Sequence, residues 1–239
     1  MKTLRLFPLL AALMVAPQLF SADTFEGRIT LNMKSGREKA VIVDYAIKEG
    51  LVRMEPKVEE SGSAAIIFNW GRQEMIMLMP EQSMFMVMPM KAMTAPAGQP
   101  AGDHTQKVEK TGKIETILGY LCGQYLTQDG KETVEMWVTD KLGMFMGLSG
   151  GGGMMGGMMG GGHGGRQSSP SGWEQAIKGK QGFFPLRVIG RNTGGKETFR
   201  MDTTKIEPGP LPDSLFAPPD GFQKFEMPNF GGMNPFKQG

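Results

Sequence analysis

The feature that most constrains this fold is an alternation of residue character with a period of two. From Phe25 to Met33, every second residue is apolar or small, and polar residues such as Arg28 and Asn32 lie between them. This period is typical of a β-strand with one buried face, and it recurs along most of the chain. It predicts a mainly β protein with a single curved antiparallel sheet, close to a half-barrel, of ten or eleven strands with little helix. One short helix is predicted, over residues 171–177.

Turn residues join the predicted strands into hairpins. Asp129-Gly130 is a strong hairpin signal, because both residues tolerate the positive φ angles of a two-residue turn. That turn would place Cys122 opposite Trp137. Residues 80–83 form a second predicted turn, between a strand that ends at Met79 and one that begins at Met84.

Residues 1–22 have the three parts of a secretory signal. Lys2 and Arg5 precede an apolar stretch over residues 6–20, and the small residues Ser21 and Ala22 suit a cleavage site. The stretch is interrupted by prolines and is shorter than the ~20 apolar residues that a membrane span needs. We therefore expect an exported protein, periplasmic or secreted, with no transmembrane anchor after cleavage. A lipid anchor is not expected either, because no cysteine lies near the cleavage site.

One folded domain is predicted over residues 23–223. It contains a long loop at 89–104, rich in Pro, Ala and Gly, and a disordered glycine- and methionine-rich insert at 143–167. Residues 224–239 are predicted to be a flexible tail. Cys122 is the single cysteine, so an internal disulfide is excluded, and a buried inert thiol is expected there.

The charge of the mature chain limits its partners. The full chain has 26 Lys and Arg against 24 Asp and Glu, and removal of Lys2 and Arg5 leaves 24 of each. A formally neutral chain argues against nucleic acid as a partner. It also argues against electrostatic docking on anionic lipid.

The methionines are the most distinctive candidate site. If the turn at 80–83 pairs Met79 with Met84, then Met77 meets Met86 and Met75 meets Met88. Six thioethers would form one patch, while the opposite face of the same hairpin is also apolar. Both faces must then be covered, one by a core and the other by a helix, loop or ligand. Because a long apolar edge strand invites aggregation, the hairpin is expected near the centre of the sheet.

Three interpretations of this methionine hairpin remain open. The six residues could simply be core, or they could line an adaptable cavity for an apolar ligand. They could also be soft donors for Cu(I) or Ag(I). The candidate ligand-binding residues, and the alternative metal ligands, are Met75, Met77, Met79, Met84, Met86 and Met88.

No catalytic motif is found, so the protein is predicted not to be an enzyme, and no cofactor is expected. The two histidines, His104 and His163, lie in predicted loops without a neighbouring nucleophile and orienting acid. Zinc-ligand spacing and phosphate-binding or dinucleotide-binding fingerprints are also missing from the sequence.

Several segments resemble a known family of exported bacterial domains. They are Met75-Ile-Met-Leu-Met-Pro-Glu-Gln-Ser-Met-Phe-Met-Val-Met88, Thr111-Gly-Lys-Ile-Glu-Thr-Ile-Leu-Gly-Tyr-Leu-Cys122, Thr133-Val-Glu-Met-Trp-Val-Thr139, Phe184-Pro-Leu-Arg-Val188, Leu211-Pro-Asp-Ser-Leu-Phe216 and Pro219-Asp-Gly-Phe222. Together they resemble DUF4412, a domain of unknown function, over roughly residues 25–223. The glycine-rich insert departs from the family pattern, and the family carries no known activity or site residues.

More distantly, the chain is similar to the lipoprotein-localisation factors LolA and LolB. This resemblance implies an antiparallel half-barrel whose apolar concave face holds acyl chains under a helical lid, although little helix is predicted here for such a lid. The leading hypothesis is non-catalytic binding of a lipid or lipoprotein-like ligand on a methionine-rich concave face. The alternatives are soft-metal binding through thioethers and a structural or interaction module of the cell envelope.

Overall fold

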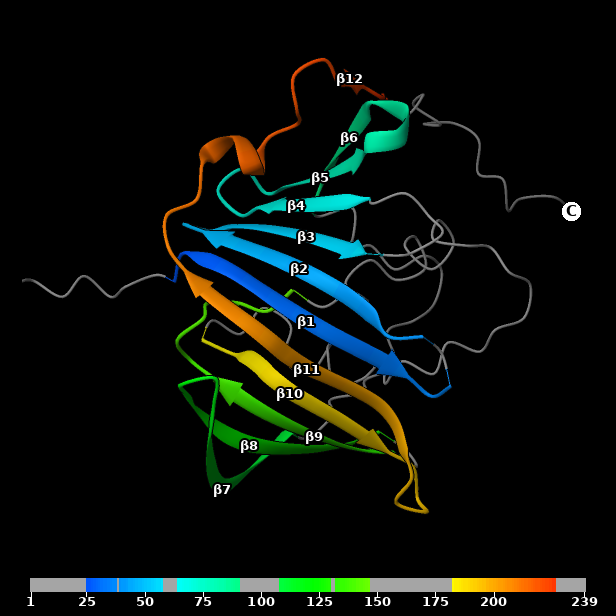
Figure 1. Ribbon diagram of the computed structural model, residues 1–239, viewed down its shortest axis with the longest axis vertical. Coiled ribbons are helices and arrows are strands. Elements are labelled where there is room, and N and C mark those ends of the chain that lie inside the picture. Colours follow the sequence, from blue (N-terminus) through cyan, green and yellow to red (C-terminus); the bar gives the residue numbers. More distant parts are fainter. Residues whose placement is uncertain are drawn as a thin grey trace, which may run out of the picture.

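The alternating segments form the strands of one curved sheet (Figure 1). The structure is a computed structural model, and it describes residues 25–37, 39–57, 64–90, 108–129, 132–146 and 182–226. The strands are β1 (Gly27–Ser35), β2 (Val41–Lys48), β3 (Leu51–Lys57), β4 (Ala65–Asn69), β5 (Glu74–Met79), β6 (Met84–Pro89), β7 (Val108–Ile117), β8 (Tyr120–Asp129), β9 (Glu132–Thr139), β10 (Phe184–Arg191), β11 (Glu197–Pro208) and β12 (Gln223–Lys224).

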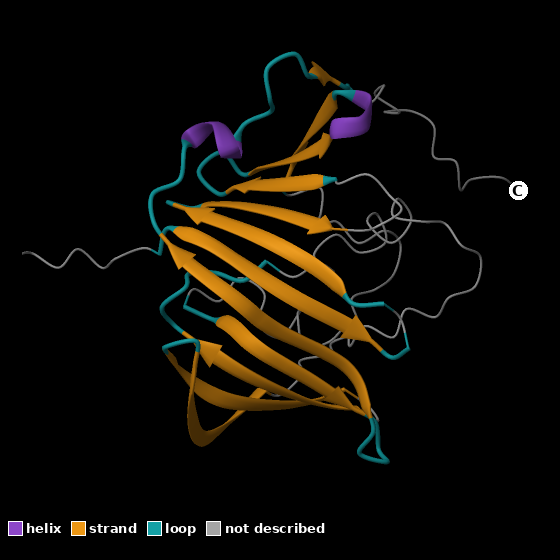
Figure 2. Cartoon of the chain, viewed as in Figure 1, coloured by secondary structure: helices purple, strands orange, loops and turns teal. Residues whose placement is uncertain are grey.

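The predicted fold class is confirmed, with a small difference in the number of strands. The sheet has 12 strands rather than ten or eleven. Eleven of them pair antiparallel, and the two-residue β12 is added parallel to β6. Helix is limited to two short 3-10 turns in the described residues, η1 (Pro80–Gln82) and η2 (Asp213–Phe216), which lie at the β4–β6 end of the sheet (Figure 2).

The chain winds outward from the centre of the sheet and then returns to it. The strand order is β12-β6-β5-β4-β3-β2-β1-β11-β10-β9-β8-β7. The first six strands form a meander toward one edge, and β7 to β11 form a second meander from the other edge back to the centre (Figure 1). The two meanders meet where β1 pairs with β11, from Gly27 opposite Pro208 to Ser35 opposite Phe199.

The main core lies on the concave side of the sheet. Because alternate residues of a strand point to opposite faces, Leu31 of β1 shares a face with Val43 of β2, and Tyr45 shares it with Met54 of β3. These side chains are buried together with those of the same face in β9, β10 and β11. A smaller apolar cluster lies on the opposite face, over β2 to β6.

The methionine hairpin lies close to an edge, so its predicted central position is wrong. It is formed by β5 and β6, and only β12 lies beyond β6. The backbone N–H of Gln223 donates to the Ser83 carbonyl at 2.9 Å, and that of Phe225 donates to the Phe85 carbonyl at 2.7 Å. The edge is thus protected by the C-terminal segment, which pairs with the exposed backbone groups of β6.

The predicted pairing of Cys122 with Trp137 is also wrong. Trp137 lies opposite Gln124, and the register between β8 and β9 ends with Asp129 opposite Glu132. The turn between β8 and β9 is therefore one residue further along the chain than the predicted Asp129-Gly130 turn. As a result, each β8 residue lies opposite a β9 residue two positions away from the predicted partner. A shift of two preserves the face of every side chain, because strand side chains alternate with a period of two.

Three predicted boundaries change. Residues 143–146, expected at the start of the insert, are described and include the buried Phe145 and Met146. Pro89 ends β6 and Met90 is buried, so the predicted loop at 89–104 starts too early. Lys224 belongs to β12 rather than to the tail. In each case the chain continues to pair or pack beyond the last alternating residue.

Other predicted segments lie outside the described residues. They are the signal at 1–22, the helix at 171–177 and the remaining parts of the loop, the insert and the tail.

Candidate functional site

The six methionines of the hairpin pair as predicted. Met75 lies opposite Met88, Met77 opposite Met86, and Met79 opposite Met84. The four inner side chains are 4–6% exposed, whereas Met79 and Met84, beside the turn, are half-buried. The structure therefore brings together all six residues in one patch, which is closed at its inner part and accessible at its rim.

Methionine also extends over the concave face beyond this hairpin. Met54 of β3, Met136 of β9 and Met201 of β11 are buried in the same core, and Met33 packs against it. Met33 and Met201 lie directly opposite each other at the central strand pair. Sequence reasoning concentrated on the clustered methionines and missed these residues, although each lies in the alternating apolar set of its own strand.

A short segment after β9 covers the centre of the concave face. Leu142, Phe145 and Met146 are buried there, and we call residues 142–146 the strap. The Phe145 ring stacks on Tyr45 with centroids 5.9 Å apart and meets Phe184 edge-on at 5.4 Å. Gly143 within this segment suggested the start of a loose loop, so the sequence concealed its packing role.

A buried side-chain hydrogen bond links the strap to the sheet, in addition to a backbone bridge between Met144 and Phe183. The Tyr45 hydroxyl donates to the Met146 carbonyl at 2.6 Å. This bond satisfies a backbone acceptor that is otherwise surrounded by apolar side chains. The strap can therefore lie in an apolar face without leaving that carbonyl unpaired.

The opposite face of the hairpin is covered by the segment that contains η2. Leu78 of β5 packs there with Ala65, Ile67, Leu211 and Phe216. This segment supplies the second cover that an apolar hairpin needs on its other face.

Two cations anchor this covering segment. Lys48 Nζ donates to the Leu211 carbonyl at 2.7 Å and pairs with the Asp213 carboxylate at 2.8 Å. The hydrogen bond with Asp213 raises the pKa of Lys48 above its ordinary value. Arg53 donates to the Leu215 carbonyl at 3.1 Å, so both ends of η2 are tied to the outer face.

The ionisable residues of β8 to β10 form a structural network. Glu135 accepts hydrogen bonds from Gln124 at 3.0 Å, from Trp137 at 2.8 Å and from Arg191 at 3.2 Å. Burial acts to raise the pKa of Glu135, but these donors together outweigh it and lower that pKa. A carboxylate held ionised by three donors is a poor general acid or base at neutral pH.

Catalytic and metal-binding clusters are not found in the described ranges. No group of three or more His, Cys, Asp and Glu side chains is placed there to hold a metal ion. Cys122 is a buried free thiol, and burial raises its pKa, which keeps it in the unreactive protonated form. Both histidines, His104 and His163, lie outside the described residues.

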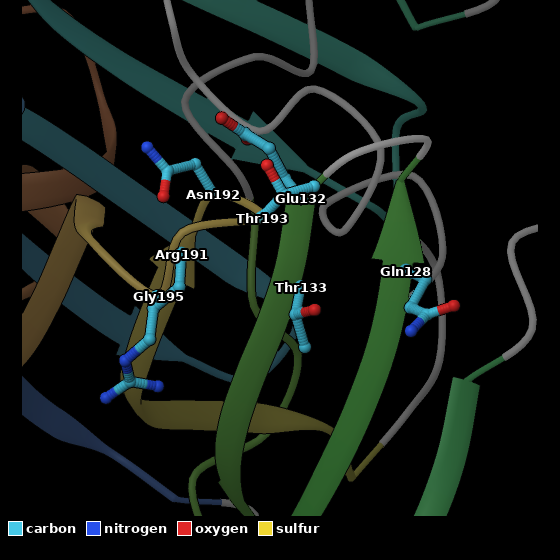
Figure 3. A pocket seen from close by; sticks show the side chains of 7 residues that line it. All are labelled: Gln128, Glu132, Thr133, Arg191, Asn192, Thr193 and Gly195. Atoms are coloured by element: carbon cyan, nitrogen blue, oxygen red, sulfur yellow. The ribbon is translucent and has the colours of Figure 1, made fainter.

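A polar cavity of about 420 Å³ lies at one end of the sheet, away from the methionine hairpin. Its lining residues are Gln128, Glu132, Thr133, Arg191, Asn192, Thr193 and Gly195 (Figure 3). The labelled side chains point in different directions rather than toward one centre. The Asn192 side chain accepts hydrogen bonds from the backbone of Gly194 and Lys196, so it stabilises the turn between β10 and β11.

No helix among the described residues is long and apolar enough to cross a membrane.

Comparisons with known proteins identify a family for most of the chain. The model of the family described as "Domain of unknown function (DUF4412)" matches residues 25–222. A comparison with curated proteins finds no match. The family expected from the sequence is thereby confirmed.

Several solved structures are similar to this one. An uncharacterized conserved protein from Thermus thermophilus is 10% identical, with a TM-score of 0.48, over 84% of this chain and 90% of that chain. A LolA superfamily protein from Nitrosomonas europaea is 12% identical, with a TM-score of 0.32, over 83% and 91%. A chain of the Pseudomonas aeruginosa MucA/MucB complex is 11% identical, with a TM-score of 0.39, over 80% of this chain and 55% of that chain.

Proposed function

The chain belongs to the DUF4412 family, whose function is unknown, and we propose that it is a non-catalytic protein that binds an apolar ligand on its methionine-rich concave face. The ligand class is an acyl chain, carried by a lipid or a lipoprotein. The observation that carries this proposal is the paired register of six methionines on one face of β5 and β6. The same face continues across the sheet with further methionines in β3, β9 and β11.

The choice of methionine supports a surface that adapts its shape. An unbranched thioether side chain can repack around apolar groups of different shape, whereas β-branched residues have stiff χ1 angles. Strands normally favour β-branched and aromatic residues. Methionine at both members of three consecutive pairs therefore departs from what a sheet alone would select.

Ligand entry requires a change in the closed face. The inner methionines Met75, Met77, Met86 and Met88 are buried, and the strap covers the centre of the same face. A ligand would enter at the half-buried rim formed by Met79 and Met84 and displace packed side chains. Its affinity then depends on how easily the strap and the methionines rearrange.

The cellular location is part of the same proposal. The predicted signal at 1–22 supports a periplasmic or secreted location. Because the chain has a single cysteine, its fold does not depend on an internal disulfide. Acyl chains must be shielded from water in transit across such a compartment, which is the role we propose for the concave face.

The paired thioethers also support a second candidate, binding of Cu(I) or Ag(I). Six soft donors face one another on two adjacent strands, with Met75, Met77 and Met79 opposite Met88, Met86 and Met84. Burial of the four inner residues counts against it, because a metal site needs donors that converge and that an incoming ion can reach. We therefore place it second.

The decisive experiment examines what the protein carries. Protein purified from its native host is analysed by native mass spectrometry and by lipid extraction, and the ligand-free protein is titrated with a soluble fluorescent fatty acid. We expect a bound lipid or acyl group and saturable uptake of the probe. A ligand-free preparation that also fails to bind the probe would exclude the proposal.

A pair of variants locates the binding face. Replacing Met79 and Met84 with Gln keeps side-chain length but makes the rim polar, and we expect probe affinity to fall about tenfold. The matched control is Val87→Thr on the opposite face of β6, which should bind the probe as the wild type does. Equal loss in both proteins would show that the effect is not confined to the methionine face.

A further inference from the structure

Exposed apolar side chains gather at the tip of the β7–β8 hairpin. Ile114 is 65% exposed, Leu118 is 48% exposed and Leu121 is 64% exposed. Only two other large apolar residues, Ile42 and Phe225, are comparably exposed in the described parts of the chain. Single exposed apolar residues are ordinary, but three on one hairpin tip form a patch that needs an explanation.

The backbone at this tip makes the choice of leucine more unusual. Leu118 and Gly119 form the turn with φ angles of 50° and 85°. The turn between β2 and β3 has the same form, with Glu49 at 41° and Gly50 at 79°. Leu118 carries two energetic costs: backbone strain from its positive φ and exposure of an apolar side chain to water. Glu49 has the same backbone strain, but its charged side chain is favourably solvated.

Ile114 and Leu121 share one face of the hairpin, whereas Ile117 and Cys122, on its other face, are buried in the main core. Ile114 is opposite Gly123. Leu121 is two residues from Gly123 and so shares its face. The pairing of β8 with β9 begins at Gly123, so the tip extends past the end of β9. The tip is therefore a projection with one buried face and one exposed apolar face.

The geometry favours a lipid bilayer as the partner of this tip. Three side chains offer far less area than the ~800 Å² that each partner contributes to a standard protein interface. The edge strand β7 carries the exposed Lys110 and Lys113 and an irregular register between Lys110 and Ile114, features that disfavour pairing with another strand. A narrow apolar tip can instead enter a fluid interface, where no shape complementarity is required.

The charges around the tip are compatible with this partner. The Glu115 carboxylate accepts two hydrogen bonds from Arg187, both at 3.0 Å, so its charge is neutralised within the sheet. Lys113, next to Ile114, makes no ion pair among the described residues and is exposed. Lys113 thus adds a positive charge at the tip, although the formal neutrality expected for the mature chain argues against docking by charge alone.

We propose that Ile114, Leu118 and Leu121 insert into the surface of a lipid bilayer and hold this edge of the sheet against it. Contact with the bilayer follows from the exposed tip alone. Transfer of an acyl chain from the bilayer to the concave face rests on the proposed function. Insertion of apolar side chains supplies most of the binding, with Lys113 favouring anionic headgroups.

Flotation with vesicles tests the contact. The purified protein is mixed with vesicles of phosphatidylethanolamine and phosphatidylglycerol at low and high salt. We expect a vesicle-bound fraction that persists at high salt. The variant Ile114→Thr/Leu118→Asn/Leu121→Thr keeps residues that suit strands and a positive φ turn, and it should lower vesicle affinity at least tenfold. Glu49→Asn, in the equivalent turn, should bind vesicles as the wild type does.

The outcomes separate the two proposals. No vesicle binding by the wild type, or equal binding by the triple variant, overturns the bilayer contact. A concentration-dependent dimer that the triple variant abolishes, without vesicle binding, would assign the tip to a protein partner instead and also overturn it. Uptake of the soluble fatty acid is measured in parallel: vesicle binding without uptake would refute the proposed function but leave the bilayer contact in place.

Discussion

The Tyr45 hydroxyl donates a 2.6 Å hydrogen bond to the Met146 carbonyl, 101 residues further along the chain. It links β2 to the strap at the centre of the concave face, beside the contact of the Tyr45 and Phe145 rings. The bond closes the same face on which we propose that the ligand binds, so stability and ligand binding should be opposed at this position.

Replacing Tyr45 with Phe tests this opposition. The change leaves a buried carbonyl without its donor, and we expect the free energy of unfolding to fall by about 1–2 kcal/mol. Because the strap then opens more easily, affinity for the soluble fatty acid should rise by up to about tenfold. Urea unfolding and probe titration measure the two effects. Tyr125→Phe is the control, because no hydrogen bond of the Tyr125 hydroxyl is found in the described residues. Equal stability of the two variants would contradict the proposed role of the Tyr45–Met146 bond.

Phe216 should hold the cover of the outer face in place. Its ring is buried against Leu78, so Phe216→Ala should cost about 3–5 kcal/mol of stability. We expect faster hydrogen exchange in η2 and β12, measured by mass spectrometry. Phe225→Ala is the matched control, because that ring is 44% exposed and its backbone N–H keeps the bond to Phe85. Unchanged exchange in Phe216→Ala would show that the polar anchors hold the segment without this ring.

The lowered pKa of Glu135 predicts a pH-dependent contribution to stability. A carboxylate whose pKa is lower in the folded state stabilises the fold above its unfolded pKa of about 4.3, and this contribution disappears as the pH falls through the folded pKa. We expect Glu135→Gln to be about 1–2 kcal/mol less stable than the wild type at pH 7. The difference should shrink below about pH 4. Thermal unfolding of both proteins at several pH values measures it.

The methionine hairpin should bind Cu(I) weakly at most. Side chains of paired strands start about 5 Å apart across the pair and about 7 Å apart along it, so convergence of three or four thioethers requires rearrangement of buried residues. Competition against a Cu(I) chelator is the measurement. The control is Met77→Leu/Met86→Leu, which preserves volume and should cost less than about 1.5 kcal/mol per site. Tight binding that disappears in this control would make metal handling the leading function.

Local patterns predicted the pairing of the methionine hairpin correctly. The three methionine pairs followed from a period of two and a short turn, both visible within residues 75–88. The register of Cys122 was wrong by two residues, because several neighbouring residues could form the connection between β8 and β9. A turn signal therefore identifies a hairpin more reliably than it sets the register.

Features that depend on distant residues were not predictable from the sequence. The position of β5 and β6 near an edge depends on the pairing of β1 with β11, which no local pattern reveals. The strap was missed because Gly143 adjoins a glycine-rich run, and its burial arises from rings on β2 and β10. The exposed Leu118 was equally hidden, since an apolar residue within an alternating stretch is normally assigned to the core.

The meeting of the two meanders has a consequence for the order of folding. Each meander pairs neighbours along the chain, but Gly27 can pair with Pro208 only after that residue, which is synthesised much later, is present. Contacts between residues so far apart form slowly, because the intervening loop must close first. A chain synthesised from its N-terminus therefore emerges with the middle of its sheet still unpaired. The unpaired edges of β1 and β11 are the surfaces through which such a chain would first misassemble or engage a chaperone.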